Sequence, residues 1–320
     1  MRFSNNELLE FLSGYVTLEE KDGYIFPKRF TPKQLKIAEE RGFFPRPNST
    51  SSMFFEFITD ASEIKFDYVV FKGSSKEYFS VDVLEDGINT FNYHNDLAIE
   101  KGTIIIPLEK QGKRKVTIYL PNLAGLGIKN FELNGNIERV TRKRTLLALG
   151  DSITQGYTTN HPYLTYVNMV ALAIDASVLN QGIGGDVFYA DNLDETLQFD
   201  PDIITVAYGT NDWSKQQNVK ENADLYFEKL RKIYPDKHIF ALLPIFRGGI
   251  KGDIRNGYSL EDVRMQIKIA AEKNNVTVIN CKDFVPHQED YFFDKTLHPN
   301  ELGFVFYAQG LSEELKKHLL

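Results

Sequence analysis

The chain contains 320 residues, of which 42% are hydrophobic, 13% aromatic and 25% charged, a composition typical of a soluble globular protein rather than a disordered or fibrous one. Its 37 lysines and arginines are outnumbered by 44 aspartates and glutamates, which gives a formal net charge of −7. A chain of this balance has no overall positive field to attract a nucleic-acid backbone, so nucleic acid is not expected as a partner.

The single cysteine, Cys281, excludes an intrachain disulfide framework and a cysteine zinc site. It follows the apolar run 276–279, so we expect a buried structural thiol. No run of 18 apolar residues occurs, and the N-terminal residues lack the apolar stretch of a secretory signal. These features predict a cytoplasmic protein without a membrane partner. The length suggests two domains at about 150 residues each.

The first 140 residues are expected to form the smaller domain. A leading helix is predicted from Pro32 to Glu40, with Thr31 as its N-cap and proline at the first helical position. Short β-rich runs then recur about every ten residues, separated by turn signals such as 86–87 and 134–135. The runs are 53–58, 66–71, 78–83, 103–107 and 116–120. This spacing is typical of an antiparallel β-sandwich.

A short basic cluster follows the sandwich. Its members are Arg139, Arg142, Lys143 and Arg144. The cluster has no interleaved aromatic residues, so we interpret it as a solvated linker between domains, with an anion-binding patch as the alternative.

Residues 145–320 are expected to form an α/β domain, because apolar runs now alternate with longer helical patterns. The candidate strands are 145–149, 177–179, 203–208, 239–243 and 276–279, and the candidate helices are 163–174, 219–234 and 260–274, the last capped by Ser259. Such alternation predicts a parallel sheet flanked by helices. In an open parallel sheet, ligands bind beyond the carboxyl ends of the strands.

Unusual residues gather in the loops that follow these strands. The first strand leads into Gly-Asp-Ser-Ile-Thr-Gln-Gly at 150–156, the second into the glycine-rich 182–185, and the third into Gly-Thr-Asn-Asp at 209–212. The last strand is followed by Leu-His-Pro-Asn at 297–300. The glycine-rich segment is not a dinucleotide-binding turn, because such a fingerprint needs its third glycine where this chain has Val187.

The order of these segments resembles the SGNH, or GDSL, hydrolase superfamily, whose four blocks supply serine, glycine, asparagine and histidine. The resemblance covers residues 145–320 and implies a flavodoxin-like three-layer α/β/α fold. It assigns Ser152 as nucleophile and His298 as the base that takes its proton, a role suited to imidazole. It places Ser152, Gly185 and Asn211 around the oxyanion as hydrogen-bond donors. It implies neither a cofactor nor a metal, and no histidine pair has the spacing of zinc ligands.

The chain departs from the family pattern before the histidine. The usual aspartate lies three residues before it, where this chain has Lys295, whereas Asp294 lies four residues before His298. Either the loop absorbs the extra residue and Asp294 orients the imidazole, or another group does so, as a backbone carbonyl does in some related esterases. We favour Asp294.

Four further residues are candidates for substrate contacts. Asp151 directly precedes the serine, and Arg247 lies beyond the fourth strand, where it either contacts substrate or is an ordinary surface arginine. Trp213 either lines an acyl or sugar pocket or packs in the core. His161 either lines a pocket or lies exposed before a helix.

The sandwich placed before an SGNH domain is similar in arrangement to the jelly-roll extension of some bacterial carbohydrate esterases. It could bind carbohydrate, cover part of the site, form a contact in a homo-oligomer or serve as a structural cap. The resulting expectation is a serine esterase that removes small acyl groups, acetyl in the first place, from a carbohydrate or similar polar substrate. The alternatives are a lysophospholipase or thioesterase of the same superfamily and an inactive carbohydrate-binding protein.

Overall fold

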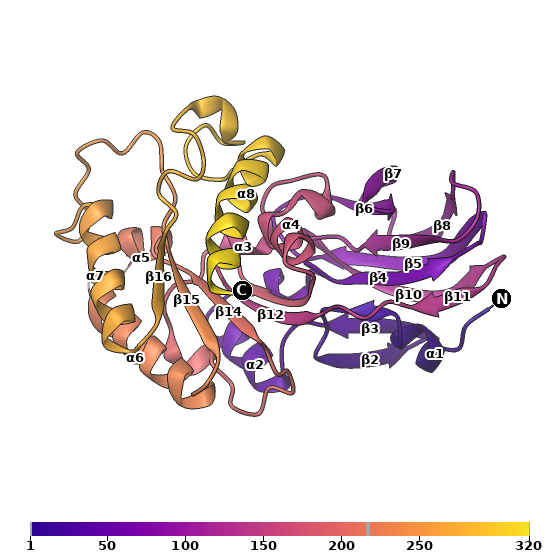
Figure 1. The fold of residues 1–320 in the computed structure, drawn as a ribbon, viewed down its shortest axis with the longest axis horizontal. Coiled ribbons are helices and arrows are strands. Elements are labelled where there is room, and N and C mark those ends of the chain that lie inside the picture. The colour runs from indigo at the N-terminus through magenta and orange to yellow at the C-terminus, as the bar shows by residue number, and fades with distance from the viewer. Residues whose placement is uncertain (1, 216–217, 320) are drawn as a thin grey trace.

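The structure, a computed structural model, describes residues 2–215 and 218–319. Figure 1 shows two parts that lie beside one another. The first half of the chain forms antiparallel strands, and the second half forms a parallel sheet covered by helices. This mixed architecture confirms the predicted fold class.

Two antiparallel sheets form the N-terminal part. One has the order β2-β3-β10-β5-β8, and the other β1-β4-β9-β6-β7 with β11 beside β4. The strands are β1 (Leu12–Ser13), β2 (Thr17–Lys21), β3 (Tyr24–Lys28), β4 (Phe54–Thr59), β5 (Glu63–Lys72), β6 (Tyr78–Glu85), β7 (Ile88–Asp96), β8 (Lys101–Pro107), β9 (Arg114–Tyr119), β10 (Ala124–Leu133) and β11 (Ile137–Arg139). Alternate residues of both sheets share one apolar core, which makes the pair a sandwich.

The five predicted strands are confirmed as β4, β5, β6, β8 and β9, but the other sandwich strands were missed, among them the long strand β10. Its glycines explain the omission, since glycine normally weakens a strand. Here Gly125 makes room for an aromatic ring, because a Cβ at that position would lie 2.1 Å from the Phe71 ring. The polar strand β7 was missed for a similar reason, because its asparagines and aspartate are typical of turns.

Helix α1 (Asn5–Leu9) packs on the sandwich core through Leu8. Helix α2 (Pro32–Glu40) lies against the second half of the chain, where the Gln34 amide donates to Gln181 Oε1 and to the Asn192 carbonyl oxygen. Helix α2 begins and ends as predicted. Its N-cap Thr31 accepts a hydrogen bond from the Gln34 N–H, and the Gln34 side chain accepts one from the Thr31 N–H, the reciprocal arrangement of a capping box.

The parallel sheet has the order β13-β12-β14-β15-β16, the flavodoxin-like topology expected. Its strands are β12 (Arg144–Gly150), β13 (Ala176–Gly182), β14 (Ile203–Ala207), β15 (His238–Leu243) and β16 (Thr277–Asn280). The helices are α3 (Ser152–Gln155), α4 (Tyr166–Ala173), α5 (Thr210–Lys215), α6 (Val219–Ile233), α7 (Leu260–Lys273) and α8 (Glu301–His318). Helices α4 and α8 pack on one face of the sheet and α6 and α7 on the other.

Buried charges join the two parts. Arg29, which is fully buried, donates from Nη1 to the carbonyl oxygens of Asn180 and Gly182 in β13 and from Nε to the carbonyl oxygen of Ser49. Each of these bonds satisfies a buried polar group, so the carboxyl end of β13 is held by a residue of the N-terminal half.

The solvated-linker interpretation of the basic cluster is wrong for Arg142. Its side chain is 8% exposed and pairs with Glu56 of β4, with Nε 2.7 Å from Oε2, and also with Asp175. An arginine matches a carboxylate through two parallel N–H groups, which explains how this one is buried between the two parts.

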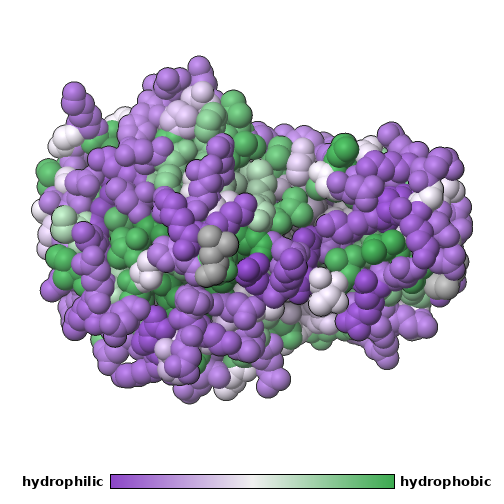
Figure 2. Space-filling view, in the orientation of Figure 1, coloured by the Kyte–Doolittle hydropathy of each residue, from purple (hydrophilic) through white to green (hydrophobic). Residues whose placement is uncertain are grey.

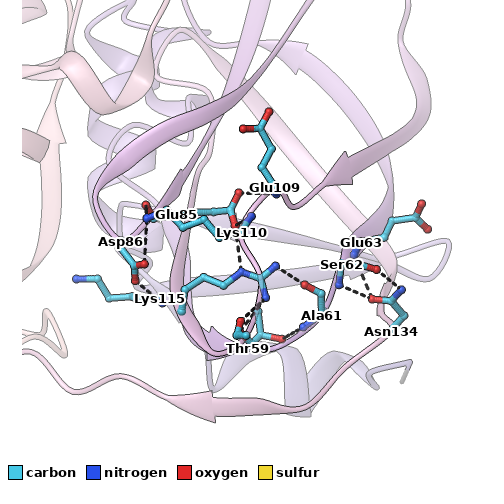
Figure 3. Close-up of polar contacts among 12 residues, drawn as sticks. Thr59, Ala61, Ser62, Glu63, Glu85, Asp86, Glu109, Lys110, Lys115 and Asn134 are labelled. Atoms are coloured by element: carbon cyan, nitrogen blue, oxygen red, sulfur yellow. Dashed lines mark hydrogen bonds and ion pairs between the residues drawn. The ribbon is translucent and has the colours of Figure 1, made fainter.

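A second buried ion pair, Glu85 with Arg114, lies within the sandwich. Glu85 accepts hydrogen bonds from the backbone N–H groups of Glu109 and Lys110 and from the Arg114 guanidinium (Figure 3). The carboxylate thus fixes the loop between β8 and β9.

The face of the molecule seen in Figure 2 is mainly hydrophilic, with apolar residues in small groups. Among the residues that the structure describes, no helix is both long and apolar enough to span a bilayer. Cys281 is buried, as expected, and burial raises the pKa of its thiol.

Candidate active site

Ser152 lies just beyond the carboxyl end of β12, the second strand of the parallel sheet. Strand β12 ends at Gly150, the Asp151 side chain accepts a hydrogen bond from the Ile153 N–H, and Ser152 opens the short helix α3. This turn brings the serine hydroxyl within 2.9 Å of Nε2 of His298. Residues 146 positions apart in the chain therefore form a hydrogen bond between a hydroxyl and an imidazole.

The other ring nitrogen of His298 contacts Asp294. Nδ1 lies 2.7 Å from Asp294 Oδ2, close enough for a charge-assisted hydrogen bond. Partial burial raises the pKa of Asp294, but hydrogen bonds from the His298 side chain and from backbone N–H groups outweigh it, so the pKa lies below its ordinary value. The carboxylate is therefore ionised and can hold the Nδ1–H tautomer of His298.

The loop accommodates its extra residue at Lys295. This residue has φ +66°, in the left-handed region that non-glycine residues seldom occupy. The turn lets Asp294 Oδ1 accept hydrogen bonds from the backbone N–H groups of Thr296, Leu297 and His298. Of the two alternatives left open by the sequence, the structure thus shows the one in which Asp294 contacts the imidazole.

The three residues predicted to stabilise the oxyanion, Ser152, Gly185 and Asn211, line the same cavity. Ser152 occupies the first position of α3, where a helical N–H has no intrahelical acceptor. Gly185 has φ +84° and lines the same cavity as Ser152, as does Asn211. The Asn211 amide nitrogen lies 3.2 Å from Asp151 Oδ2 and 3.1 Å from the Asp186 carbonyl oxygen, both at the long end for such bonds.

Gln155 is a site residue that the sequence reasoning did not single out, although it lies in the same seven-residue motif. Its Oε1 accepts a hydrogen bond from the Gly184 N–H, while its Nε2 donates to the Ser49 hydroxyl and the Gly73 carbonyl oxygen. One side chain therefore links the loop that carries Gly185 to two segments of the N-terminal half.

Three buried aspartates lie behind these groups. Burial raises the pKa of Asp151 to about 6 and that of Asp212 to about 7, and it also raises the pKa of Asp186. Asp186 is paired with Arg41 at 2.8 Å. Asp151 is thus a neighbour of Asn211 beneath the site and does not line the cavity that contains Ser152.

The serine, the histidine, Gly185 and Asn211 open onto one cavity of about 490 Å³. Its walls come from both halves of the chain. The lining residues are Pro45, Arg46, Lys72, Ser74, Ser75, Ser152, Gln155, Tyr157, Gly184, Gly185, Asn211, Leu297 and His298. The sandwich therefore covers part of the site, which was one of the roles considered for it.

The remaining sequence candidates lie outside the residues that line this cavity. Trp213 is buried in the core under α6 and α7, with Nε1 donating to the Tyr258 carbonyl oxygen. Arg247 packs over the Trp213 ring and donates to Thr210. His161 contacts Asp82 of β6 at 3.2 Å. A substrate contact of these three residues stays a prediction, whereas their packing and interdomain contacts are observed.

The described residues contain no cluster of three histidine, cysteine or acidic side chains placed to hold a metal ion. The chemistry available at the cavity is that of a hydroxyl hydrogen-bonded to an imidazole, which in turn is hydrogen-bonded to a carboxylate. This constellation and the flavodoxin-like sheet define the class of SGNH-type hydrolases.

Comparison with known proteins agrees with this class. Residues 148–304 match the GDSL-like lipase/acylhydrolase family, in agreement with the resemblance of the four sequence blocks. The chain is accordingly a carboxylic ester hydrolase. No curated protein sequence matches it.

Solved structures share the whole architecture at low sequence identity. Salicylyl-acyltransferase SsfX3 from a tetracycline biosynthetic pathway is 18% identical with a TM-score of 0.83, covering 97% of this chain and 94% of its own. A family two carbohydrate esterase from Clostridium thermocellum, solved with cellohexaose, is 17% identical with a TM-score of 0.66, covering 93% and 99%. The acetyl xylan esterase Est2A from Butyrivibrio proteoclasticus is 16% identical with a TM-score of 0.65, covering 100% and 98%. At these identities the similarity establishes the fold alone.

Proposed function

We propose that this esterase removes a small acyl group, acetyl in the first place, from an oxygen of a carbohydrate or similarly polar molecule, and that it does so through an acyl-enzyme. The observation that carries the proposal is the hydrogen-bonded series Ser152–His298–Asp294, with distances of 2.9 and 2.7 Å. A serine hydroxyl becomes an effective nucleophile only when a neighbouring base takes its proton.

In the first step the Ser152 oxygen attacks the ester carbonyl carbon while His298 Nε2 accepts the hydroxyl proton. The carbonyl oxygen becomes an oxyanion, which receives hydrogen bonds from the N–H groups of Ser152 and Gly185 and from the Asn211 amide. When the bond to the alcohol oxygen breaks, His298 returns the proton to the departing alcohol. Asp294 stabilises the imidazolium between these two transfers.

In the second step a water molecule attacks the acyl carbon of the ester formed with Ser152. His298 takes a proton from this water and then gives one to the Ser152 oxygen as that bond breaks. The products are the free acid and the original enzyme, so no external oxidant, reductant or cofactor is consumed.

The residues that line the cavity favour a polar alcohol, because serine hydroxyls and the cations Arg46 and Lys72 can bind its oxygen atoms. Carbon atoms nevertheless make up the larger part of the exposed wall, and burial of each acyl methylene on apolar surface is worth about 0.8 kcal/mol. The length of the acyl chain therefore has to be measured, with the lysophospholipase as the alternative.

A chain-length series of p-nitrophenyl esters tests the acyl preference. We expect kcat/KM to be highest for acetate and to decline beyond butyrate. A preference for chains of about eight carbons or more would contradict the acetyl assignment.

Covalent labelling tests the nucleophile. A fluorophosphonate should modify Ser152 stoichiometrically, and the modification should be absent in the Ser152→Ala variant. An unlabelled Ser152 in folded protein that also fails to release acetate from acetylated sugars would favour the inactive carbohydrate-binding alternative.

A further inference from the structure

The charge of the cavity is opposite to that of the chain. The chain carries a net charge of −7, yet no aspartate or glutamate is found among the residues that line the cavity in the described parts of the chain. The lining includes Arg46 and Lys72 instead. A concave site lined by one sign of charge concentrates the field and attracts ligands of the other sign.

Two more cations lie at the edge of the cavity. Lys215 Nζ donates to the Gly185 carbonyl oxygen at 2.7 Å, and Lys76 Nζ lies 5.2 Å from the centre of the Tyr157 ring. Two anions offset part of this charge, because Glu77 pairs with Lys72 at 2.6 Å and the Asp294 carboxylate contacts His298. The balance at the mouth of the cavity remains positive.

Arg46 is the cation best placed to bind a ligand. A Cβ on Gly184 would lie 3.1 Å from Arg46 Cδ and 3.5 Å from its Nε, so the side chain runs along the segment that leads into Gly185. Its nearest ring is Phe43, at 5.9 Å. Within residues 2–215 and 218–319, no carboxylate pairs with the Arg46 guanidinium and no oxygen accepts a hydrogen bond from it.

A half-buried guanidinium without a partner presents N–H groups in a fixed planar fork. That geometry matches a carboxylate or a phosphate through two parallel hydrogen bonds. The N-terminal half therefore contributes a group suited to anion recognition to the cavity that Ser152 also lines, at the start of the 3₁₀ helix Arg46–Asn48.

We propose that the acylated substrate carries a negatively charged substituent, a carboxylate or a phosphate, and that Arg46 binds it while the ester carbon lies at Ser152. The proposal rests on the proposed esterase function and narrows its substrate to acidic polar molecules, such as an acetylated uronic acid or sugar phosphate. Lys72 adds to the attraction without direct pairing, because Glu77 already binds it.

The test compares matched substrates that differ in charge alone. The methyl glycoside of mono-O-acetyl glucuronic acid is compared with its carboxamide, and mono-O-acetyl glucose 6-phosphate with mono-O-acetyl glucose, by acetate release. We expect kcat/KM to be about ten-fold higher for at least one charged member of these pairs, the size typical of a hydrogen bond to a charged group. The pair with the larger ratio identifies carboxylate or phosphate as the group bound.

Arg46→Gln should bring the ratio of kcat/KM between the charged and the neutral substrate close to one. Arg46→Lys should keep only part of this preference, because lysine lacks the two parallel N–H groups of the guanidinium. The control is Lys268→Gln on α7, which removes an exposed cation that does not line the cavity and should leave the ratio unchanged. Thermal unfolding midpoints of the three variants verify that each is folded.

Equal kcat/KM for the charged and neutral members would overturn this inference while leaving the esterase proposal intact. An equal fall for both members in Arg46→Gln would also overturn it, because Arg46 would then act on the reaction and not on the substituent. If wild-type protein releases no acetate from any of the four substrates or from p-nitrophenyl acetate, the proposed function itself fails.

Discussion

The Asp294 carboxylate contacts His298 twice. Its Oδ1 accepts a hydrogen bond from the His298 backbone N–H, and its Oδ2 lies 2.7 Å from Nδ1 of the His298 ring. In Asp294→Asn the amide oxygen can still accept the backbone N–H groups, so the loop is kept, while an uncharged NH₂ donor replaces the carboxylate oxygen that faces the ring. We predict a decrease in kcat of roughly 10⁴-fold, by analogy with other serine hydrolase triads. Steady-state hydrolysis of p-nitrophenyl acetate measures it.

The control for this variant is Asp290→Asn, which neutralises a neighbouring exposed aspartate and should change kcat little. If Asp294→Asn keeps near-wild-type turnover, Asp294 does not orient His298.

Gln155→Met tests whether the N-terminal half positions the loop that carries Gly185. The variant removes the acceptor of the Gly184 N–H and the donor to Ser49 and Gly73 at nearly constant volume. Loss of a fixed donor to an oxyanion typically lowers kcat by 10²- to 10³-fold. Because the variant loosens the loop but keeps the Gly185 N–H, we expect kcat to fall by about ten- to 100-fold, with little change in KM. A matching rise in KM with constant kcat would instead assign Gln155 to substrate binding.

Asp212→Asn should change stability in a pH-dependent way. Burial raises the pKa of Asp212 to about 7, above the value near 4 of an unfolded chain. Below pH 4 both states hold the proton, but between pH 4 and 7 the unfolded state releases it first, so the wild-type protein loses stability as the pH rises.

The Asn variant lacks this loss and should therefore be more stable than wild type at pH 8, by on the order of 2–4 kcal/mol, with the difference fading below pH 4. Urea unfolding at several pH values measures it, and the exposed Asp191→Asn is the control. A difference that does not vary with pH would show that ionisation of Asp212 is not its cause.

Arg29→Met should destabilise the whole molecule. The variant leaves the carbonyl oxygens of Ser49, Asn180 and Gly182 without their buried donor, and each such loss costs about 1–3 kcal/mol. We expect the free energy of unfolding to fall by at least about 3 kcal/mol in urea titrations. The control Lys36→Met, on the exposed face of α2, should have a free energy of unfolding within about 0.5 kcal/mol of the wild-type value. A small effect for Arg29 would show that water replaces the guanidinium.

The division proposed from the sequence, with residues 1–140 and 145–320 as separate domains, can be tested through the same contacts. Because Arg46, Lys72 and Ser74 line the cavity and Ser49 binds Gln155, we predict that a fragment of residues 141–320 is inactive or insoluble. Full activity of the fragment would leave the sandwich without a part in catalysis.

Local sequence signals carried most of the architecture. The alternation of apolar runs and amphipathic stretches located the five parallel strands, and the Thr31 and Ser259 caps placed the starts of α2 and α7. The four family blocks located Ser152, Gly185, Asn211 and His298, which the structure brings to one cavity.

What could not be predicted depends on contacts between distant segments. The burial of Arg142 requires Glu56, 86 residues earlier in the chain, and the function of Gln155 depends on Ser49 and Gly73. The type of a residue indicates which bonds it can form, but its partner follows only from the fold. Trp213 is a further example, because its indole N–H donates to the carbonyl oxygen of Tyr258, 45 residues later in the chain.

The left-handed backbone at Lys295 bears on how such enzymes are recognised. A pattern written with two residues between aspartate and histidine rejects this chain and would group it with enzymes that lack an acidic member, although the carboxylate reaches the ring. Sequences with three intervening residues should be kept in such searches when the first of them is unbranched at Cβ, since a valine or isoleucine resists the required turn.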